Sequence, residues 1–131
     1  MREVLFRAKR IDDGEWIEGF LFSTNEHTYI AYPNQFDDDL FLSPKEIFIE
    51  VDPETICQYT GLTDKNGRKI FEGDILRFED CSNYPVVWDS DYCAFGSCWY
   101  SDFDHLSKYR SIKIEVVGNI FDNSEILENE D

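Results

Sequence analysis

A tight hairpin signal between two partly apolar segments constrains the fold of this chain most strongly. Asn66-Gly67 predicts a two-residue type I′ turn, because both central residues of that turn need a positive φ, which these residue types tolerate best. Asp64 stands two residues ahead, where its carboxylate can accept hydrogen bonds from turn NH groups. Residues 70–78 then alternate as a strand does, and Gly73 among them indicates a β-bulge or a close backbone approach. We therefore expect a β-sheet protein rather than a helical bundle.

The first third of the chain predicts an antiparallel meander of three strands. The strands are residues 4–11, 16–22 and 28–32, and the turns between them are residues 12–14 and 23–26. A short apolar run at residues 47–51 adds a strand, and Asp52-Pro53 predicts one helical turn, since Asp caps helices and Pro suits their first position. Residues 33–46 include Asp37, Asp38 and Asp39 and are expected to form an exposed loop.

The second half predicts a small barrel of five short strands, SH3-like or related. Its elements are the hairpin, strands at residues 74–79, 86–88, 93–100 and 112–121, and polar turns at residues 80–85, 89–91 and 101–111. In the last strand Ile112, Ile114 and Val116 share one face, which should be buried while the other face is wet. Residues 124–128 are expected to add one weak helical turn.

The composition supports an all-β fold with two small antiparallel subdomains. Eleven Phe, seven Tyr and three Trp stand against one Met, and aromatic residues are enriched in strands. The predicted organisation is an N-terminal β-meander at residues 1–56, a C-terminal small β-barrel at residues 57–123 and an acidic tail at residues 124–131.

The charge of the chain argues against direct nucleic-acid binding. Twelve basic residues against 28 acidic residues give a formal net charge of −16, which repels a phosphate backbone. No apolar run approaches the roughly 20 residues of a membrane span, and the first residues lack the apolar core of a signal peptide. We therefore expect a cytoplasmic protein that does not enter a membrane.

The four cysteines do not form a recognisable metal or disulfide framework. Cys57, Cys81, Cys93 and Cys98 match neither paired C-x-x-C zinc knuckles nor a dense disulfide scaffold. Thiols are therefore expected, and a zinc site with His27 or His105 is the alternative.

Catalytic and cofactor motifs are missing from the sequence. It contains no G-x-S-x-G elbow, no G-x-x-x-x-G-K loop and no G-x-G-x-x-G fingerprint. Asp64-x-Asn66 matches the start of a calcium loop, but position twelve, which needs a bidentate Glu, is Ile75, so the turn interpretation is preferred. We expect no enzyme and no cofactor or metal site. The alternative is a carboxylate-rich, metal-dependent hydrolase using the 37–39 loop with Asp102 and Asp104, beside His105 in an expected surface turn.

Aromatic residues concentrate late in the chain, more densely than one barrel face can bury. They are Trp88, Tyr92, Phe95, Trp99, Tyr100 and Phe103. Either the rings alternate between the core and a covered sheet face, or some form a patch for protein binding or self-association.

Residues 58–75 resemble the signature of the YopX family, proteins encoded largely by bacteriophages and prophages. The signature is QYTGL-x-DKNG-x-x-I-x-EGDI, and looser similarity covers most of the chain. The matching positions, which we interpret as structural, are Gln58, Tyr59, Thr60, Gly61, Leu62, Asp64, Asn66, Gly67, Glu72, Gly73 and Asp74. The resemblance implies a fold and a phage context, and no catalytic residue carries over from it.

The function predicted from these features is that of a non-enzymatic phage accessory protein acting through protein contacts in the cytoplasm of a bacterial host. Sheet edges and aromatic faces favour a homo-oligomer. A more specific version is an acidic DNA mimic that modulates a host protein of unknown identity. The candidate partner surface is Asp37, Asp38, Asp39, Trp99 and Tyr100.

Overall fold

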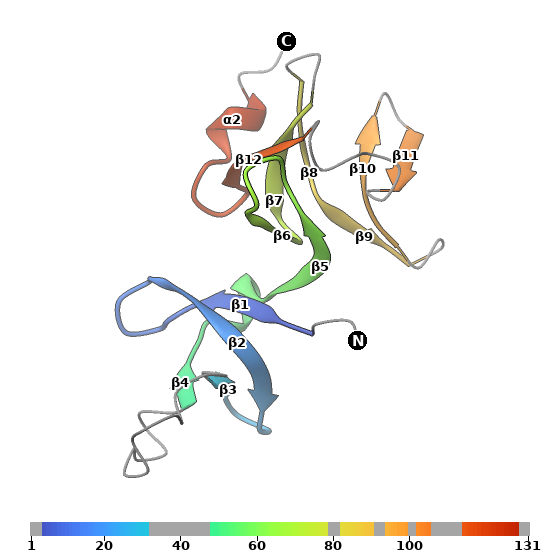
Figure 1. Cartoon of the computed structure of the whole chain (residues 1–131). Helices are drawn as coiled ribbons and strands as arrows, with labels where there is room; N and C mark the ends of the chain where they lie inside the picture. Colours follow the sequence, from blue (N-terminus) through green and yellow to red (C-terminus); the bar gives the residue numbers. More distant parts are fainter. Residues whose placement is uncertain are drawn as a thin grey trace. The chain divides into compact units, whose positions relative to one another are not determined.

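The chain is mostly β, which confirms the predicted fold class (Figure 1). The computed structural model describes residues 4–31, 48–78, 82–90, 94–99, 102–105 and 114–128. The chain divides into two compact units, Met1–Gln58 and Tyr59–Asp131. Strand β5, Cys57–Thr63, runs across this division, and each unit is described separately.

The first unit contains an antiparallel sheet with the strand order β4-β3-β2-β1, followed by the first two residues of β5. Its strands are β1 (Phe6–Lys9), β2 (Trp16–Ser23), β3 (Thr28–Ala31) and β4 (Phe48–Glu50). These positions confirm the predicted meander and the predicted strand near residues 47–51. The segment 33–46, with its three aspartates, lies outside the described residues.

A short 3-10 helix, η1 (Pro53–Thr55), joins β4 to β5 and confirms the predicted helical turn. Asp52 caps it, and its Oδ1 accepts a hydrogen bond from the backbone NH of Glu54 at 3.0 Å. Thr55 is buried, and its hydroxyl accepts from the backbone NH of Lys9 at 2.8 Å while donating to the carbonyl of Asp52 at 2.7 Å. One hydroxyl thus connects the helix to strand β1.

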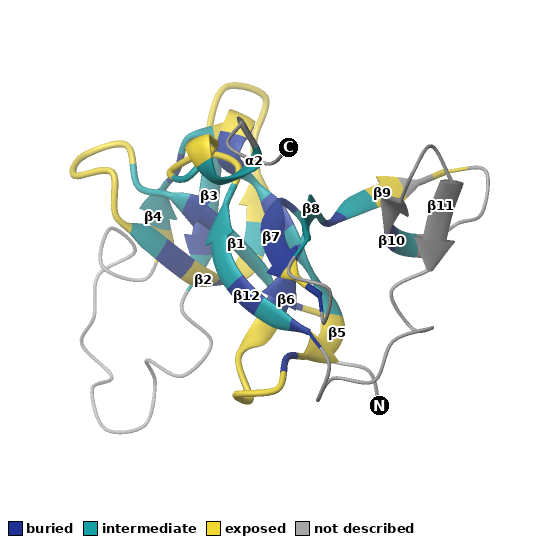
Figure 2. Ribbon diagram, turned by 90° about the horizontal axis from the view of Figure 1, so that it is seen from above, coloured by how far each residue is buried: buried dark blue, intermediate teal, exposed yellow. Residues whose placement is uncertain are grey.

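The inner face of the first sheet forms its own hydrophobic core. Residues along β2 alternate between buried and exposed positions (Figure 2). Ile17 is one of the buried residues. Ile17 packs with Ala8, Ile30 and Val51, all of them buried. Gly19 also lies on the inner face, where an added Cβ would collide with the backbone carbonyl of Ala31. The absence of a side chain therefore lets neighbouring strands approach at this point.

Among its described residues, the second unit contains three groups of paired strands and one short helix. Strand β5 pairs with β6, β7 lies between β12 and β8, and β10 lies between β11 and β9. The elements are β6 (Lys69–Phe71), β7 (Asp74–Arg77), β8 (Asn83–Pro85), β9 (Val87–Asp89), β10 (Ala94–Trp99), β11 (Asp102–His105), β12 (Glu115–Asn119) and α2 (Glu125–Glu128). Pairing within the described residues does not join these groups into a barrel, so the SH3-like detail is not confirmed.

Two segments predicted as turns contain strands. Strand β8 lies inside the predicted turn 80–85, and its Tyr84 contributes an aromatic ring that packs on Phe78 at 6.0 Å between ring centroids. Strand β11 lies inside the predicted turn 101–111 and pairs antiparallel with β10, so His105 is a strand residue. In both segments the turn-forming or acidic residues, with their low β propensity, concealed a strand that tertiary pairing stabilises.

The core of the second unit brings together strands that are far apart in sequence. It consists of Ile70, Leu76, Phe78, Val86, Ile114 and Val116. Burying side chains of this size contributes roughly 1.5–3 kcal/mol each. The predicted buried face of the last strand is confirmed at Ile114 and Val116, while Ile112 lies outside the described residues.

Candidate functional site

The segment with the strongest sequence signal forms a three-residue loop, so the predicted two-residue type I′ turn is wrong. The backbone NH of Asp64 donates to the carbonyl of Arg68 at 2.8 Å, and the NH of Gly67 donates to the carbonyl of Asp64 at 3.0 Å. Gly67 has a φ of +80°, in the left-handed region that closes three-residue hairpin loops. Lys65, Asn66 and Gly67 therefore make the connection, and Gly67 alone occupies the glycine position.

The Asp64 carboxylate explains why this loop is favoured. Its Oδ1 accepts from the backbone NH groups of Asn66 and Arg68, both at 2.9 Å, and its Oδ2 accepts from that of Val116 at 2.9 Å. Asp64 is only 2% exposed. Burial alone would raise the pKa of Asp64, but the hydrogen bonds from Val116, Arg68 and Asn66, together with the Arg68 charge, outweigh it and lower the pKa. Both oxygens are engaged by backbone NH groups, which supports the turn interpretation over a calcium loop.

Lys65 and Arg68, which lie close to Asp64 in the sequence, form hydrogen bonds to the same distant segment, residues 114–116. The backbone NH of Lys65 donates to the carbonyl of Ile114 at 3.0 Å, and Nη1 of Arg68 donates to the carbonyl of Val116 at 3.3 Å. We name Asp64, Lys65 and Arg68 the β12 clasp. Its bonds link the hairpin to a strand about fifty residues later, so its role is structural.

The earlier signature residues shape strand β5. The Thr60 hydroxyl donates to the carbonyl of Ile70 at 2.7 Å, and the ring centroids of Tyr59 and Phe71 lie 5.5 Å apart. The β5–β6 register shifts between Tyr59 and Thr63, a range that includes Gly61 with its φ of +90°. Gln58, at the end of the first unit, pairs with Phe6 of β1. Leu62 lies near the other end of β5, in the second unit, and is exposed.

The later signature residues form the connection between β6 and β7. Glu72 and Gly73 make a turn in which Gly73 has a φ of +87°, so the alternative of a bulge at Gly73 is wrong. The alternative of a close backbone approach holds, since the Gly73 NH donates to the carbonyl of Val86 and its carbonyl accepts from Ile120. Buried Asp74 accepts from the NH of Phe71 at 2.8 Å. Gly73 and Asp74 therefore both make hydrogen bonds that stabilise this connection.

The structure leaves the predicted partner surface largely untested. Asp37, Asp38, Asp39 and Tyr100 lie outside the described residues, and Trp99 is placed only as the last residue of β10. Asp102 and Asp104 are placed only through the backbone of β11. Within the described residues, no three His, Cys, Asp or Glu side chains are arranged to hold a metal ion.

The thiol prediction is confirmed for Cys57. It is buried, and its Sγ donates to the carbonyl of Thr55 at 3.3 Å. Cys81 and Cys93 lie outside the described residues, and the side chain of Cys98 is not described.

The outer face of the first sheet carries an aromatic patch that sequence reasoning missed. We define the outer face patch as Trp16, Phe20, Phe22, Tyr29 and Phe48. Strand register places Phe22 beside Tyr29, and Phe20 and Phe48 on either side of Ala31, all on the side opposite the core. The Phe22 ring centroid lies 6.3 Å from that of Tyr29 and 5.5 Å from that of Phe48. Phe20, Phe22 and Phe48 are nevertheless 53%, 50% and 39% exposed.

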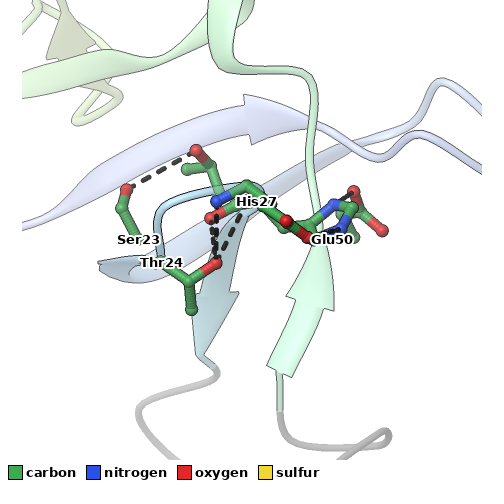
Figure 3. A network of polar contacts seen from close by, with 6 residues as sticks. Ser23, Thr24, His27 and Glu50 are labelled. Atoms are coloured by element: carbon green, nitrogen blue, oxygen red, sulfur yellow. Dashed lines mark hydrogen bonds and ion pairs between the residues drawn. The ribbon is translucent and has the colours of Figure 1, made fainter.

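Charged groups of both signs border the patch. On β1, the Arg7 guanidinium lies 4.8 Å and the Lys9 ammonium 5.5 Å from the centroid of the Trp16 ring. On β4, Glu50 is the register partner of Tyr29 and its Oε2 lies 2.7 Å from Nδ1 of His27 (Figure 3). The Phe side chains of the patch are thus bordered by Arg7 and Lys9 beside Trp16, and by the carboxylates of Glu18, the register partner of Arg7, and Glu50.

The loop that carries His27 is ordered by its own hydrogen bonds. The backbone NH of Thr24 donates to the carbonyl of His27 at 2.8 Å, and the NH of His27 donates to the Thr24 hydroxyl at 3.1 Å (Figure 3). The border of the patch at His27 and Glu50 therefore has a defined shape although it is exposed.

The sequence matches the family described as YopX protein over residues 5–128. The chain belongs to the YopX family. The family resemblance inferred from residues 58–75 is thereby confirmed, and in this YopX family member those residues form β5, the hairpin and the β12 clasp. No curated protein matches the sequence closely enough to count as a relative. Within the described residues no helix is long and apolar enough to cross a membrane.

Proposed function

We propose that this YopX family member is a non-enzymatic accessory protein that acts through protein contacts, and that the outer face patch makes one of them. The observation that carries the proposal is the exposure of Phe20, Phe22 and Phe48 side by side on one sheet face. The signature residues, by contrast, are occupied with folding, as the β12 clasp illustrates.

The size of the patch supports a binding role. An aromatic side chain has roughly 150–250 Å² to bury, so three Phe side chains left about half exposed offer roughly 300 Å² of apolar surface. Patches of that order are near the largest that typical monomers expose, and they often bind partners. Aromatic residues also dominate the binding energy at many interfaces.

The net charge of −16 favours a basic surface on a heterologous partner. In the more specific version, carboxylates such as Asp37, Asp38 and Asp39 stand in for backbone phosphates, and the protein occupies a nucleic-acid groove of a host protein in the bacterial cytoplasm. Such binding is strongest at low ionic strength, because salt screens exposed charges.

Affinity capture from a bacterial lysate, performed at low and high salt, tests the proposal. The wild-type protein is expected to retain a specific protein at low salt, and Phe22→Ser should retain less of it than Phe121→Ser, the control that replaces another exposed Phe in the second unit. Charge reversal of Asp37, Asp38 and Asp39 to Lys should release a basic partner if the mimic version holds. Equal capture by wild type and Phe22→Ser would show that the outer face patch does not contribute to the contact.

A further inference from the structure

We propose that Asn66 is a site of non-enzymatic modification, where the closed hairpin loop suppresses deamidation and the product of deamidation prevents the loop from closing again. Asn66 and Gly67 are both exposed, so water reaches them. An Asn followed by Gly is the least hindered substrate for this reaction, because no Cβ lies next to the attacking backbone nitrogen. The proposal concerns the hairpin alone and is independent of the outer face patch.

The reaction needs no reactant other than water. The backbone nitrogen of Gly67 forms a bond to Cγ of Asn66, and the side-chain nitrogen takes up the proton that Gly67 loses and leaves as ammonia. One water molecule then hydrolyses the resulting cyclic succinimide at either of its two C–N bonds. One product has an ordinary Asp at position 66. The other is isoaspartate, whose main chain runs through Cβ and Cγ.

The closed loop restrains both reacting groups. The Gly67 NH donates to the carbonyl of Asp64 at 3.0 Å, so a hydrogen bond holds the proton that must leave. The Asn66 side chain is held through its Nδ2, which donates to Oε2 of Glu115 at 3.4 Å, and its backbone NH donates to the Asp64 carboxylate at 2.9 Å. Attack needs the two reacting atoms about 3–3.5 Å apart with their orbitals aligned. Restrained groups reach that geometry when the loop opens locally.

Isoaspartate lengthens the loop by one backbone atom. The Asp64 Oδ1 accepts from NH groups on both sides of the altered link, those of Asn66 and Arg68, each at 2.9 Å. A longer main chain between these NH groups should break at least one of the two bonds. Because the same carboxylate accepts from the Val116 NH, the β12 clasp weakens with them. Refolding does not reverse the hydrolysis, so the modification is permanent.

Mass spectrometry of peptides from the full chain, incubated at mildly alkaline pH, measures deamidation at Asn66. The reference for an open loop is a synthetic peptide of residues 60–70. The folded chain should react at least about tenfold more slowly than this peptide, because the open loop is a minor population. Urea that unfolds the chain should restore the rate of the peptide, and Asn66→Gln should lose the signal, because its longer side chain would have to form a larger ring. Equal rates in the folded chain and the peptide, or no reaction at Asn66 in the unfolded chain, would overturn the proposal.

Two variants separate opening of the loop from unfolding of the chain. Asp64→Ala removes the acceptor of the loop NH groups and should raise the rate at Asn66 about tenfold or more, as expected when more than about 1 kcal/mol of closing free energy is lost. Thr55→Val, which weakens the first unit, is the control and should leave the rate unchanged. If Asp64→Ala does not fold, Arg68→Met serves instead, since it removes only the bond to the Val116 carbonyl and should accelerate the reaction less. Equal acceleration in the loop variant and the control would overturn the proposal.

The effect of the product is measured on chain that has been deamidated in urea, refolded and separated by ion exchange. The isoaspartate form should unfold at a lower urea concentration than Asn66→Asp. Both carry the same new charge beside Glu115, so the comparison isolates the additional backbone atom. Equal unfolding midpoints would overturn the inference that the product prevents closure of the loop.

Discussion

Replacing Asp64 with Asn should weaken folding through the β12 clasp, although the two side chains are almost the same size. One oxygen of the carboxylate accepts hydrogen bonds from the backbone NH groups of Asn66 and Arg68, and the other accepts one from the NH of Val116. An amide has a single acceptor oxygen, so an NH2 group must face one of these donors. The buried Val116 NH then loses its partner, which costs about 1–3 kcal/mol, and the remaining bonds lose their charge assistance. We expect the free energy of unfolding to fall by about 2–4 kcal/mol.

Urea unfolding followed by circular dichroism and tryptophan fluorescence measures this loss. The matched control is Asp52→Asn, because Asp52 accepts one exposed NH group at the start of η1, where Asn caps as well as Asp. The control should remain within about 0.5 kcal/mol of wild type. An Asp64→Asn variant as stable as the Asp52→Asn variant would refute the assignment of the clasp as a main stabilising feature.

The lowered pKa of Asp64 adds a pH dependence with a definite sign. Burial opposes ionisation, but the hydrogen bonds to Val116, Arg68 and Asn66 outweigh it, so the folded pKa lies below the ordinary value of 3.8. The stabilisation is therefore fully present above about pH 4 and is lost as the pH falls through the folded pKa. The gap in unfolding free energy between wild type and Asp64→Asn should shrink as the pH is lowered toward about 2. A gap that widens with acidification would contradict this sign.

Three further substitutions separate other sources of stability, each measured by urea or thermal unfolding. Gly67→Ala should cost about 1–2 kcal/mol from the left-handed backbone alone, because nothing lies near the added methyl group, and a neutral result would contradict the loop conformation. Gly19→Ala should cost about 1–3 kcal/mol for a steric reason, since the methyl group meets the rigid carbonyl of Ala31, and unchanged stability would show that the strands can separate there. Thr55→Val should cost about 1–3 kcal/mol because the NH of Lys9 loses its acceptor, and a stable variant would show that water replaces the hydroxyl.

The sequence predicted those elements in which local pattern and tertiary role agree. Strands β1 to β4 follow alternating apolar residues, and η1 follows the capping preference of Asp52 and the fixed φ of Pro53. The hairpin was also located correctly, because Gly67 is needed wherever the chain must adopt a positive φ. The predicted loop length was wrong because the Asp64 carboxylate accepts hydrogen bonds from the NH groups of Asn66 and Arg68. The preference of Asn-Gly for a two-residue turn does not take these bonds into account.

The elements that the sequence concealed depend on partners far along the chain. Strand β8 is stabilised by pairing with β7 and by packing of Tyr84 on Phe78, and neither contact is visible in Asn83-Tyr84-Pro85 itself. The Val116 NH that completes the Asp64 site is similarly remote. Local propensity carries no information on such contacts.

The outer face patch had a signal in the sequence that was not used. In β2 the inward residues Ile17 and Leu21 alternate with the outward residues Phe20 and Phe22, so the strand is apolar on both faces near its end. A strand of a one-layer sheet with a wet face should alternate apolar with polar residues. Apolar residues on both faces of this strand therefore predict the exposed apolar patch that the structure shows.

The signature residues and the outer face patch differ in what their side chains contact, and this difference determines which substitutions can reveal function. Replacing Asp64 or Gly67 affects any activity indirectly, because the hairpin and strand β12 lose stability together. Replacing Phe22 removes a half-exposed ring that contacts Tyr29 and Phe48 on the outer face, and the core of the first unit remains filled. A loss of association in Phe22→Ser without a loss of unfolding free energy would therefore report on binding itself. The same loss in Asp64→Asn would report only on the folded fraction.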